Sequence, residues 1–210
     1  MQRIRIIYSR GEELLYVGNL DMHKIWERTF RRADLKLAYS QGFHPQPRIH
    51  QACPLPLGFT SSNEILDFWL DSDESIAQIQ QKINEAIQPG MKILQVLDIP
   101  LNAPPLQTLV KAAKYVVMFT DAIDPIDLQN KITAFLSKNT CMRERRGKQY
   151  DLLSLVQSLE FTETPQPTLE MTLVTLPGAT GRPEEVLDEL SIPLTSVSID
   201  RKQLIFSNDL

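Results

Sequence analysis

Residues 39–58 read YSQGFHPQPRIHQACPLPLG, and this stretch decides the fold because it separates a β-α segment before it from a β-α-β segment after it. It holds two glycines, four prolines and two of the three histidines of the chain. Prolines fix φ and remove backbone donors, so the stretch cannot form a regular helix. We expect a stiff loop with a strand near residues 48–52. Loops on a rigid scaffold are where binding residues concentrate.

The segment before this loop predicts one strand and one helix. Residues 2–9, QRIRIIYS, alternate polar and apolar side chains as a strand does. A turn follows, and residues 14–17 are expected to continue the strand or to form a short second one. Asn19 is a good N-cap for an amphipathic helix over residues 20–33.

The segments after the loop complete the pattern and then repeat it. The expected order is β-α-β-β-α-β in each half, so the predicted fold class is α+β, with two tandem ferredoxin-like units and antiparallel sheets. The predicted domains are residues 1–98 and 114–210, joined by a proline-rich linker over 99–113. The further expected elements are strands at 63–71, 91–97, 114–120, 168–176 and 196–206, helices at 75–87, from 124 and at 182–190, and a basic strand or hairpin at 141–150.

Charge is distributed unevenly along a mildly acidic chain. The 210 residues carry 22 Lys and Arg against 26 Asp and Glu, a formal net charge of −4, which argues against a protein coated with phosphate-binding charge. Residues 1–50, however, hold nine basic and five acidic side chains, whereas residues 51–100 hold two and seven. We therefore expect a locally basic face.

The two cysteines and the hydropathy pattern indicate a cytoplasmic protein without membrane contact. Cys53 and Cys141 are isolated, so the chain has no spacing for a zinc ribbon or a cysteine-ligated iron–sulfur cluster. Free thiols fit a reducing compartment. The N-terminus lacks the apolar core of a signal peptide, and no run approaches the ~18 apolar residues of a membrane span.

Two clusters of cations and the aromatic side chains of the loop predict a nucleic-acid surface. One cluster lies on the polar face of the helix at 20–33, and the other is the run RERRGK at 143–148. Solvated charges on a helix face and on a hairpin tip are the alternative. The residues predicted to contact nucleic acid are Lys24, Arg28, Arg31, Arg32, Tyr39, Phe43, His44, Arg48, Arg143, Arg145, Arg146 and Lys148.

The glycines and prolines of the loop predict a brace that presents its aromatic side chains without an ordering cost. Glycine permits positive φ, while proline limits the unfolded conformations. In the alternative, the loop covers the open sheet and buries Tyr39 and Phe43. The residues assigned to the structure of the loop and its surroundings are Asp21, Gly42, Pro45, Pro47, Gly58 and Glu64.

The histidines suggest a second hypothesis, in which the protein is a catalyst. Spacings within the set of His23, His44 and His50 do not force metal ligands to converge, so no metal site is predicted. His44 or His50 beside Arg48 would suit metal-independent RNA cleavage, which needs a group that titrates near neutrality beside a cation. No Walker loop, nucleophile elbow or HExxH motif is present. A non-enzymatic role is therefore favoured.

A run of short motifs within the first 71 residues carries a family resemblance. It comprises Gly18-Asn19-Leu20-Asp21, Trp26-Glu27-Arg28, Arg31-Arg32-Ala33, Tyr39-Ser40-Gln41-Gly42-Phe43-His44-Pro45, Pro47-Arg48, Leu55-Pro56-Leu57-Gly58 and Glu64. With this run, the first 71 residues closely resemble the radical-SAM-linked protein family, also called domain of unknown function 2344. Within the run, many members carry Ser-His at residues 18–19 and histidine at residue 46, where this chain has Gly18-Asn19 and Gln46. Weaker similarity follows at residues 146–151 and 182–185.

This resemblance implies a domain encoded beside, or fused behind, a radical SAM enzyme. The iron–sulfur cluster and SAM are expected on that partner, and no cofactor is expected in this chain. The leading hypothesis is an accessory domain that binds RNA or presents substrate in tRNA or rRNA modification. The alternatives are a protein-interaction module for the radical SAM subunit and a metal-independent endoribonuclease, since the element order is also similar to that of Cas6-type RNA-processing proteins.

Overall fold

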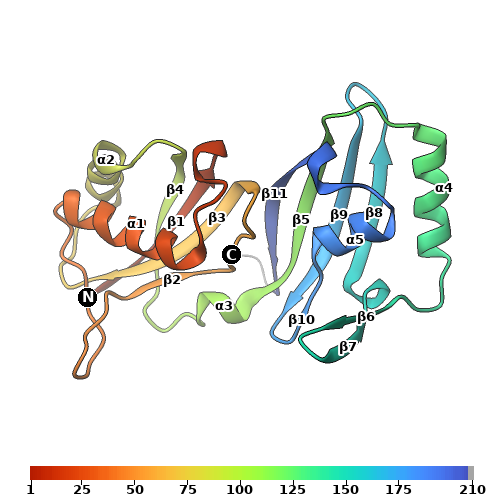
Figure 1. The fold of residues 1–210 in the computed structure, drawn as a ribbon. Coiled ribbons are helices and arrows are strands. Elements are labelled where there is room, and N and C mark those ends of the chain that lie inside the picture. The colour runs from red at the N-terminus through yellow and green to blue at the C-terminus, as the bar shows by residue number, and fades with distance from the viewer. Residues whose placement is uncertain (208–210) are drawn as a thin grey trace. The chain divides into compact units, whose positions relative to one another are not determined.

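The structure is a computed structural model and describes residues 1–207 (Figure 1). The chain divides into two compact units, Met1–Val110 and Lys111–Leu210, which we call unit 1 and unit 2. The division falls inside the expected connection at residues 99–113. The α+β fold class is confirmed, with helices set against mostly antiparallel sheet. No helix within residues 1–207 is both long and apolar enough to cross a membrane.

Unit 1 is built on four antiparallel strands. Their order across the sheet is β4 (Met91–Ile99), β1 (Gln2–Arg10), β3 (Phe59–Leu70) and β2 (Ile49–Gln51). In the register Ile6 lies opposite Leu66, and Ile49 opposite Phe68. Successive residues of a strand face opposite sides, so these four side chains share one face of the sheet.

Two helices, α1 (Asn19–Arg32) and α2 (Ile76–Ala86), cover that face (Figure 1). Trp26 and Phe30 of α1 are fully buried against the sheet. Ring centroids lie 4.8 Å apart for Tyr8 and Trp26, 5.2 Å for Trp26 and Phe30, and 4.2 Å for Phe30 and Phe68. This chain of aromatic contacts fixes α1 on the sheet, because aromatic pairs at such separations add to the energy of area burial.

The entry to α1 differs from the expectation. Residues 14–17 form no strand; the short 3-10 helix η1 (Glu12–Leu14) and a turn take their place. The reason is Arg10, whose buried guanidinium donates to the carbonyls of Leu14, at 2.5 Å, and Val17, so these acceptors need no strand partner. The N-cap is Gly18, with an extended backbone, and Asn19 is the first helical residue. The Asn19 cap prediction was therefore wrong.

Unit 2 repeats the alternation of strands and helices around antiparallel sheet. In this sheet β9 lies between β5 and β8, and β11 lies beside β5. The elements are β5 (Val110–Phe119), α4 (Pro125–Leu136), β6 (Met142–Arg145), β7 (Lys148–Asp151), η2 (Leu153–Leu155), β8 (Val156–Thr162), β9 (Thr168–Leu176), β10 (Ala179–Thr180), α5 (Pro183–Glu189), η3 (Leu194–Ser196) and β11 (Val197–Phe206).

Three boundaries differ from the sequence prediction. The helix α3 (Leu106–Leu109) has only four residues, because β5 begins at Val110, earlier than the expected strand. Residues 156–162, which carried no assignment, form β8. The last strand begins at Val197, one residue later than expected. The basic segment at 141–150 forms the β6–β7 hairpin, in agreement with one of its two expected forms.

Candidate functional site

Residues 38–48 form a projecting hairpin, which we call the finger (Figure 1). Its two sides are joined by hydrogen bonds from the Arg48 N–H to the Ala38 carbonyl, at 2.9 Å, and from the Ser40 N–H to the Gln46 carbonyl, at 2.8 Å. The Gln46 N–H also donates to Ser40 Oγ at 3.0 Å. The stretch predicted as a stiff loop is therefore a hydrogen-bonded element whose base continues into β2.

The tip of the finger is open to solvent. Phe43 is 102% exposed, so the alternative in which this loop buries Phe43 is wrong. Gly42, next to it, has φ +129°, a conformation that side-chain-bearing residues rarely adopt. Tyr39, at the base, is 41% exposed, and its hydroxyl accepts a hydrogen bond from Arg31 Nη2 at 3.5 Å. The finger thus joins the polar face of α1 through its base and leaves its tip free.

Most cations of α1 are engaged within unit 1. Lys24 lies 3.6 Å from Asp21, and Arg31 Nη2 lies 2.6 Å from Glu27 Oε1. Arg32 donates to the Ala86 carbonyl at the end of α2, at 2.8 Å. Among residues 1–207, Arg28 has no ion-pair partner. It is exposed, and it precedes Arg31 by three positions, so both share one helix face.

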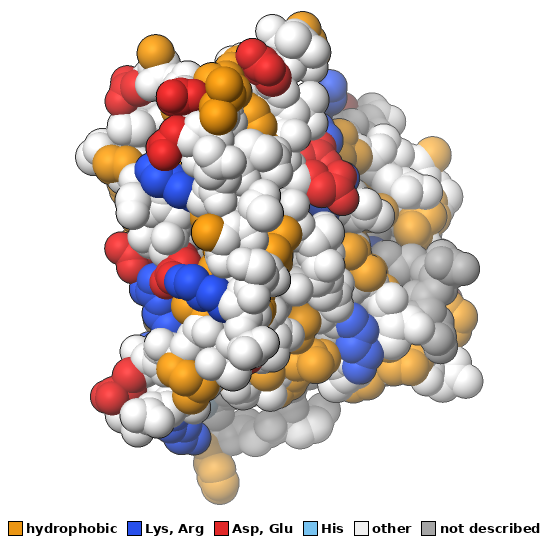
Figure 2. Space-filling view, turned by 90° about the vertical axis from the view of Figure 1, so that its right-hand side faces the viewer, with side chains coloured by type: hydrophobic (Ala, Val, Ile, Leu, Met, Phe, Trp, Pro, Cys, Tyr) orange, Lys and Arg blue, Asp and Glu red, His pale blue; other side chains and the backbone are white. Residues whose placement is uncertain are grey.

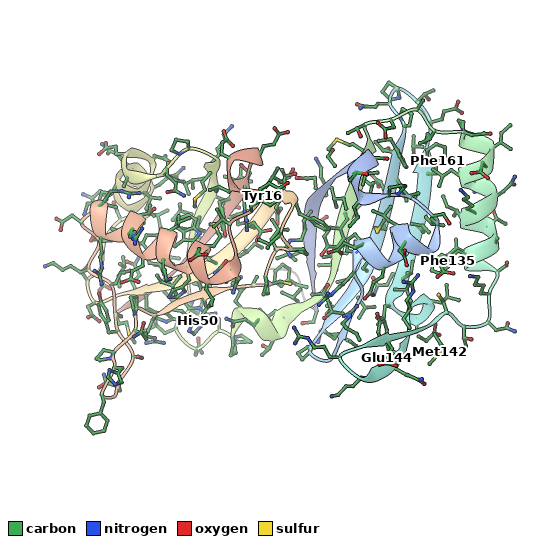
Figure 3. The ribbon with its side chains drawn as sticks, in the orientation of Figure 1. Tyr16, His50, Phe135, Met142, Glu144 and Phe161 are labelled. Atoms are coloured by element: carbon green, nitrogen blue, oxygen red, sulfur yellow. The ribbon has the colours of Figure 1, made fainter. Side chains whose placement is uncertain are left out.

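Arg48 lies on the other face of the sheet. Ile49 packs in the core with α1, so its neighbours Arg48 and His50 point away from that helix. The Arg48 guanidinium carbon is 4.5 Å from the Trp69 ring centroid, and the His50 ring is 4.9 Å from it, edge to face. Figure 3 shows His50 on β2. The α1 cations and Arg48, both assigned to the predicted nucleic-acid surface, therefore lie on two different faces, with the finger at their shared edge.

A buried charge cluster lies beneath Trp69 and was missed by the sequence reasoning. Asp67, fully buried, accepts from Arg3 Nη2 at 2.6 Å and from Arg5 Nε at 2.7 Å. Arg3 also donates to the carbonyls of Ala103 and Pro104, at 2.6 and 2.9 Å. The Asp67 carboxylate thus forms ion pairs with both guanidinium groups. The available signal was a pair of arginines two apart in the first strand, with an aspartate among apolar residues inside the next long strand.

The structure separates the candidate catalytic histidines. His44 is exposed on the finger, whereas His50 lies on β2 beside Arg48. Burial, and then the charge of Arg48, lower the pKa of His50 below its usual value. No group of three or more His, Cys, Asp or Glu side chains within residues 1–207 is placed to hold a metal ion. The arrangement supplies side chains that can bind a ligand, and it does not bring the two histidines together as a catalytic pair.

The residues assigned to loop structure lie around the finger and its return to β3. Gly42 and Gly58 have positive φ, +129° and +82°. The Gly58 N–H donates to the Leu15 carbonyl at 2.7 Å, which ties residues 53–58 to the entry of α1. Of the others, Asp21 pairs with Lys24, Pro45 is exposed, Pro47 is buried and forms a bridge with Tyr39, and Glu64 is 4% exposed.

In unit 2, the RERRGK cations divide into two sets. Arg143 contacts Asp188 at 2.6 Å and Glu189 at 2.8 Å, both near the end of α5. Arg145 pairs with Glu185 at 2.5 Å. Arg146 and Lys148, at the hairpin turn, are exposed and have no ion pair among residues 1–207. Figure 2 shows basic and acidic side chains interspersed on one face of the molecule, with no broad patch of one sign.

Glu189 forms ion pairs with two cations of unit 2, Lys138 and Arg143. Hydrogen bonds from Lys138 and Arg143 lower the pKa of the Glu189 carboxyl to about 2, with burial acting against them. The same acids, Glu189 first and then Asp188, raise the pKa of Arg143. These groups hold the hairpin against α5, so the charges of Arg143 and Arg145 are compensated within unit 2.

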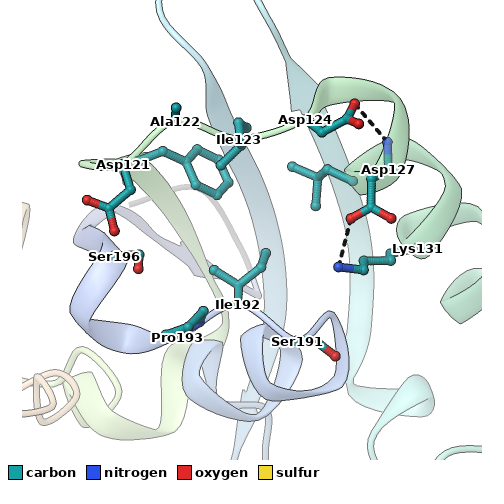
Figure 4. Close-up of a pocket in the computed structure, with 12 residues that line it drawn as sticks. Asp121, Ala122, Ile123, Asp124, Asp127, Lys131, Ser191, Ile192, Pro193 and Ser196 are labelled. Atoms are coloured by element: carbon teal, nitrogen blue, oxygen red, sulfur yellow. Dashed lines mark hydrogen bonds and ion pairs between the residues drawn. The ribbon is translucent and has the colours of Figure 1, made fainter.

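A pocket of about 260 Å³ opens in unit 2 at the start of α4 (Figure 4). Its floor is apolar, with Phe119, Leu128 and Ile192. Two of its carboxylates are engaged: Asp124 accepts from backbone N–H groups as the N-cap of α4, and Asp127 pairs with Lys131 at 2.8 Å. Asp121, Ser191 and Ser196 also line the pocket.

The fold and surface define a two-unit α+β protein with a projecting finger at the edge of a sheet that has Arg28 on one side and Arg48 on the other. The chain belongs to the family described as "Uncharacterized protein conserved in bacteria (DUF2344)", whose model matches residues 3–183. The predicted membership of domain of unknown function 2344 is thereby confirmed. No curated protein matches the chain.

Two solved structures are similar over nearly the whole chain. One is an unknown protein from Galdieria sulphuraria, with 13% identity, 99% of this chain and 98% of that chain covered, and a TM-score of 0.27. The other is the acetolactate synthase small subunit from Thermotoga maritima, with 12% identity, 100% and 98% covered, and a TM-score of 0.29. Scores this low support no inference about fold or function.

Proposed function

We propose that this protein is an accessory RNA-binding domain that presents substrate to a radical SAM enzyme in tRNA or rRNA modification. The observation that carries the proposal is the finger of unit 1. Its tip exposes the whole Phe43 side chain, and Arg28 and Arg48, which have no carboxylate partner within residues 1–207, lie on the two faces beside its base. Exposed cations bind phosphate and exposed aromatics stack on bases, which together are the groups that single-stranded nucleic acid requires.

The strand order supports a more specific account of the scaffold. In unit 1 the elements follow as β-α-β-β-α-β, and the sheet order β4-β1-β3-β2 is the one a ferredoxin-like unit needs. In unit 2 the order β11-β5-β9-β8 corresponds to it, with the β6–β7 hairpin inserted after α4. We therefore propose tandem ferredoxin-like units, a fold that serves many functions and does not select one.

The partner in this proposal comes from the sequence resemblance. The radical SAM enzyme would supply the iron–sulfur cluster and SAM, and this chain would hold the RNA. Neither Cys53 nor Cys141 belongs to a disulfide within residues 1–207, which fits a cytoplasmic location for such a pair. The buried thiol of Cys141 has a raised pKa, caused first by burial, so it is a weak nucleophile and does not argue for redox chemistry.

A salt titration tests RNA binding directly. The wild-type protein and the Arg28→Ala/Arg48→Ala variant are titrated with labelled bulk tRNA at several salt concentrations. We expect the variant to bind more weakly and to show a slope of log K against log salt that is shallower by about 1.4 to 1.8, since two phosphate contacts are lost. Lys92→Ala, an exposed cation on β4 of the same unit, is the control and should match the wild type. No binding by the wild type at low salt would refute the proposal.

A second candidate function, a protein-interaction module for the radical SAM subunit, is favoured by a separate observation. Tyr16, Leu20 and Leu57 are 83%, 78% and 58% exposed. The Gly58–Leu15 hydrogen bond joins the loop of Leu57 to the turn of Tyr16, and Leu20 follows in the first turn of α1. Figure 3 shows Tyr16 at the end of unit 1 where α1 begins. Exposed apolar groups gathered in this way are typical of protein interaction sites.

Co-purification separates the two candidates. The Tyr16→Ser/Leu20→Ser variant and Phe43→Ala are each expressed with the radical SAM partner. If the chain only binds protein, the first variant loses the partner and the wild type shows no RNA affinity. If the RNA proposal holds, Phe43→Ala loses RNA affinity and retains the partner.

A further inference from the structure

The two cationic groups of unit 1 lie on opposite faces of one sheet edge. Arg28 and Arg31 belong to the helix that covers one face, and Arg48 stacks on Trp69 on the other. Between them runs β2, which has three residues and pairs with β3 alone among the strands within residues 1–207. A ligand that reaches both groups must therefore turn around this edge.

The finger stands at the same edge. Its base is the bond between Ala38 and Arg48, immediately before β2, and residues 41–46 are all exposed. The Phe43 ring, fully exposed, has both faces open to solvent. A polymer turning around the edge passes this ring, so a flat group along that polymer can stack on it.

We infer that the RNA bound by this protein is a single-stranded segment that turns around the β2 edge and stacks one unpaired base on Phe43. The inference rests on the proposed RNA-binding function and names its substrate class. A base within a duplex is stacked on both sides, so the Phe43 ring has no face to meet there. A duplex is also stiff over the few nucleotides concerned, whereas a single strand bends and presents its bases outward.

The chemistry of the edge suits a single strand on both sides. On the α1 face, Arg28 has no ion-pair partner in the part of the chain that the structure describes, and Arg31 is paired with Glu27. On the other face, Arg48 is held flat against Trp69, and His50 beside it is exposed and adds a second donor. Phosphates before and after the stacked base would thus meet one guanidinium each, while the base itself is read only through its flat face.

The test compares one RNA sequence in two forms. Labelled unstructured RNA of about 12 nucleotides, within the range that a compact single-strand-binding fold covers, and its blunt duplex are titrated against the full chain. We expect the single strand to bind at least about tenfold more tightly than the duplex. Phe43→Ala should weaken binding of the single strand by about tenfold and leave the duplex unchanged, while Phe43→Trp should retain the affinity.

Each outcome decides between the two proposals. If neither RNA binds, the proposed function fails and this inference fails with it. Equal affinity for both forms, or a single-strand preference that Phe43→Ala leaves intact, overturns the inference alone and leaves RNA binding standing. Phe43→Ala removes no buried contact, so its circular dichroism and melting temperature should equal those of the wild type and exclude misfolding.

Discussion

The guanidinium carbon of Arg48 lies 4.5 Å from the centroid of the Trp69 ring, on the sheet face opposite α1. The contact fixes a long, flexible side chain at the base of the finger. Trp69 is itself held from the other strand by Arg3, at 5.1 Å. An arginine ordered in this way loses less conformational entropy when it binds a phosphate, so the ring contributes to binding without contacting the ligand.

Replacing Trp69 therefore separates positioning from charge. Trp69→Phe keeps an aromatic face for Arg48, and we expect its RNA affinity to stay close to that of the wild type. Trp69→Leu removes that face, so we expect the affinity to fall about two- to fivefold, the equivalent of a cation–π contact near a surface. Urea unfolding of both variants serves as the stability control. Equal affinities for the Phe and Leu variants would contradict the positioning role.

Asp67 is predicted to be the most sensitive charge for the stability of unit 1. Asp67→Asn leaves Arg3 and Arg5 buried without their shared carboxylate, and breaking a buried pair in this way costs about 3–5 kcal/mol. Urea unfolding measures the loss. Asp71→Asn, an exposed carboxylate four residues further on, is the matched control and should change stability by less than about 0.5 kcal/mol. Similar losses in both variants would contradict this account.

Glu189 predicts a pH dependence for unit 2. Its folded pKa of about 2 lies below its ordinary 4.5, so the carboxylate stabilises the fold above pH 4.5 and this contribution disappears as pH falls through about 2. We expect Glu189→Gln to be less stable than the wild type at neutral pH, with the difference shrinking over that window. Chemical unfolding at several pH values measures it. A difference independent of pH would refute the assignment.

The lowered pKa of His50 predicts that the affinity for RNA depends on pH. Burial and Arg48 lower its pKa below 6.5, so it is neutral at pH 7 and gains charge only at lower pH. RNA affinity should therefore rise as pH falls below 6.5, and His50→Gln should remove most of this rise. Above pH 7 the two proteins should bind RNA alike, and this comparison is the control. Cleavage of the RNA in EDTA that is lost in His50→Ala would instead favour the endoribonuclease alternative.

The α+β class and the family were predictable because they rest on local patterns. The alternation in residues 2–9 and the apolar stripe in residues 20–33 depend only on residues that are close in sequence. The strand and the helix that they predict are both present. The entry to α1 was not predictable, because Arg10 satisfies carbonyls four and seven residues away and replaces the expected strand pairing.

The candidate site was predictable in composition and not in arrangement. The exposure of Phe43 depends on hydrogen bonds between Ser40 and Gln46 that no local propensity indicates. The division of Arg28 and Arg48 between two faces follows from the register of β2 on β3, which pairs Ile49 with Phe68. Pairings of this kind join distant parts of the chain, so only the folded structure reveals them.

Ultraviolet crosslinking of the wild-type protein to single-stranded RNA, with the crosslinked peptides identified by mass spectrometry, tests the central claim most directly. The account predicts crosslinks within residues 38–48, with Phe43 the main site because its ring is the most exposed. Crosslinks confined to the β6–β7 hairpin, or the absence of any crosslink under conditions where a known RNA-binding protein reacts, would contradict it.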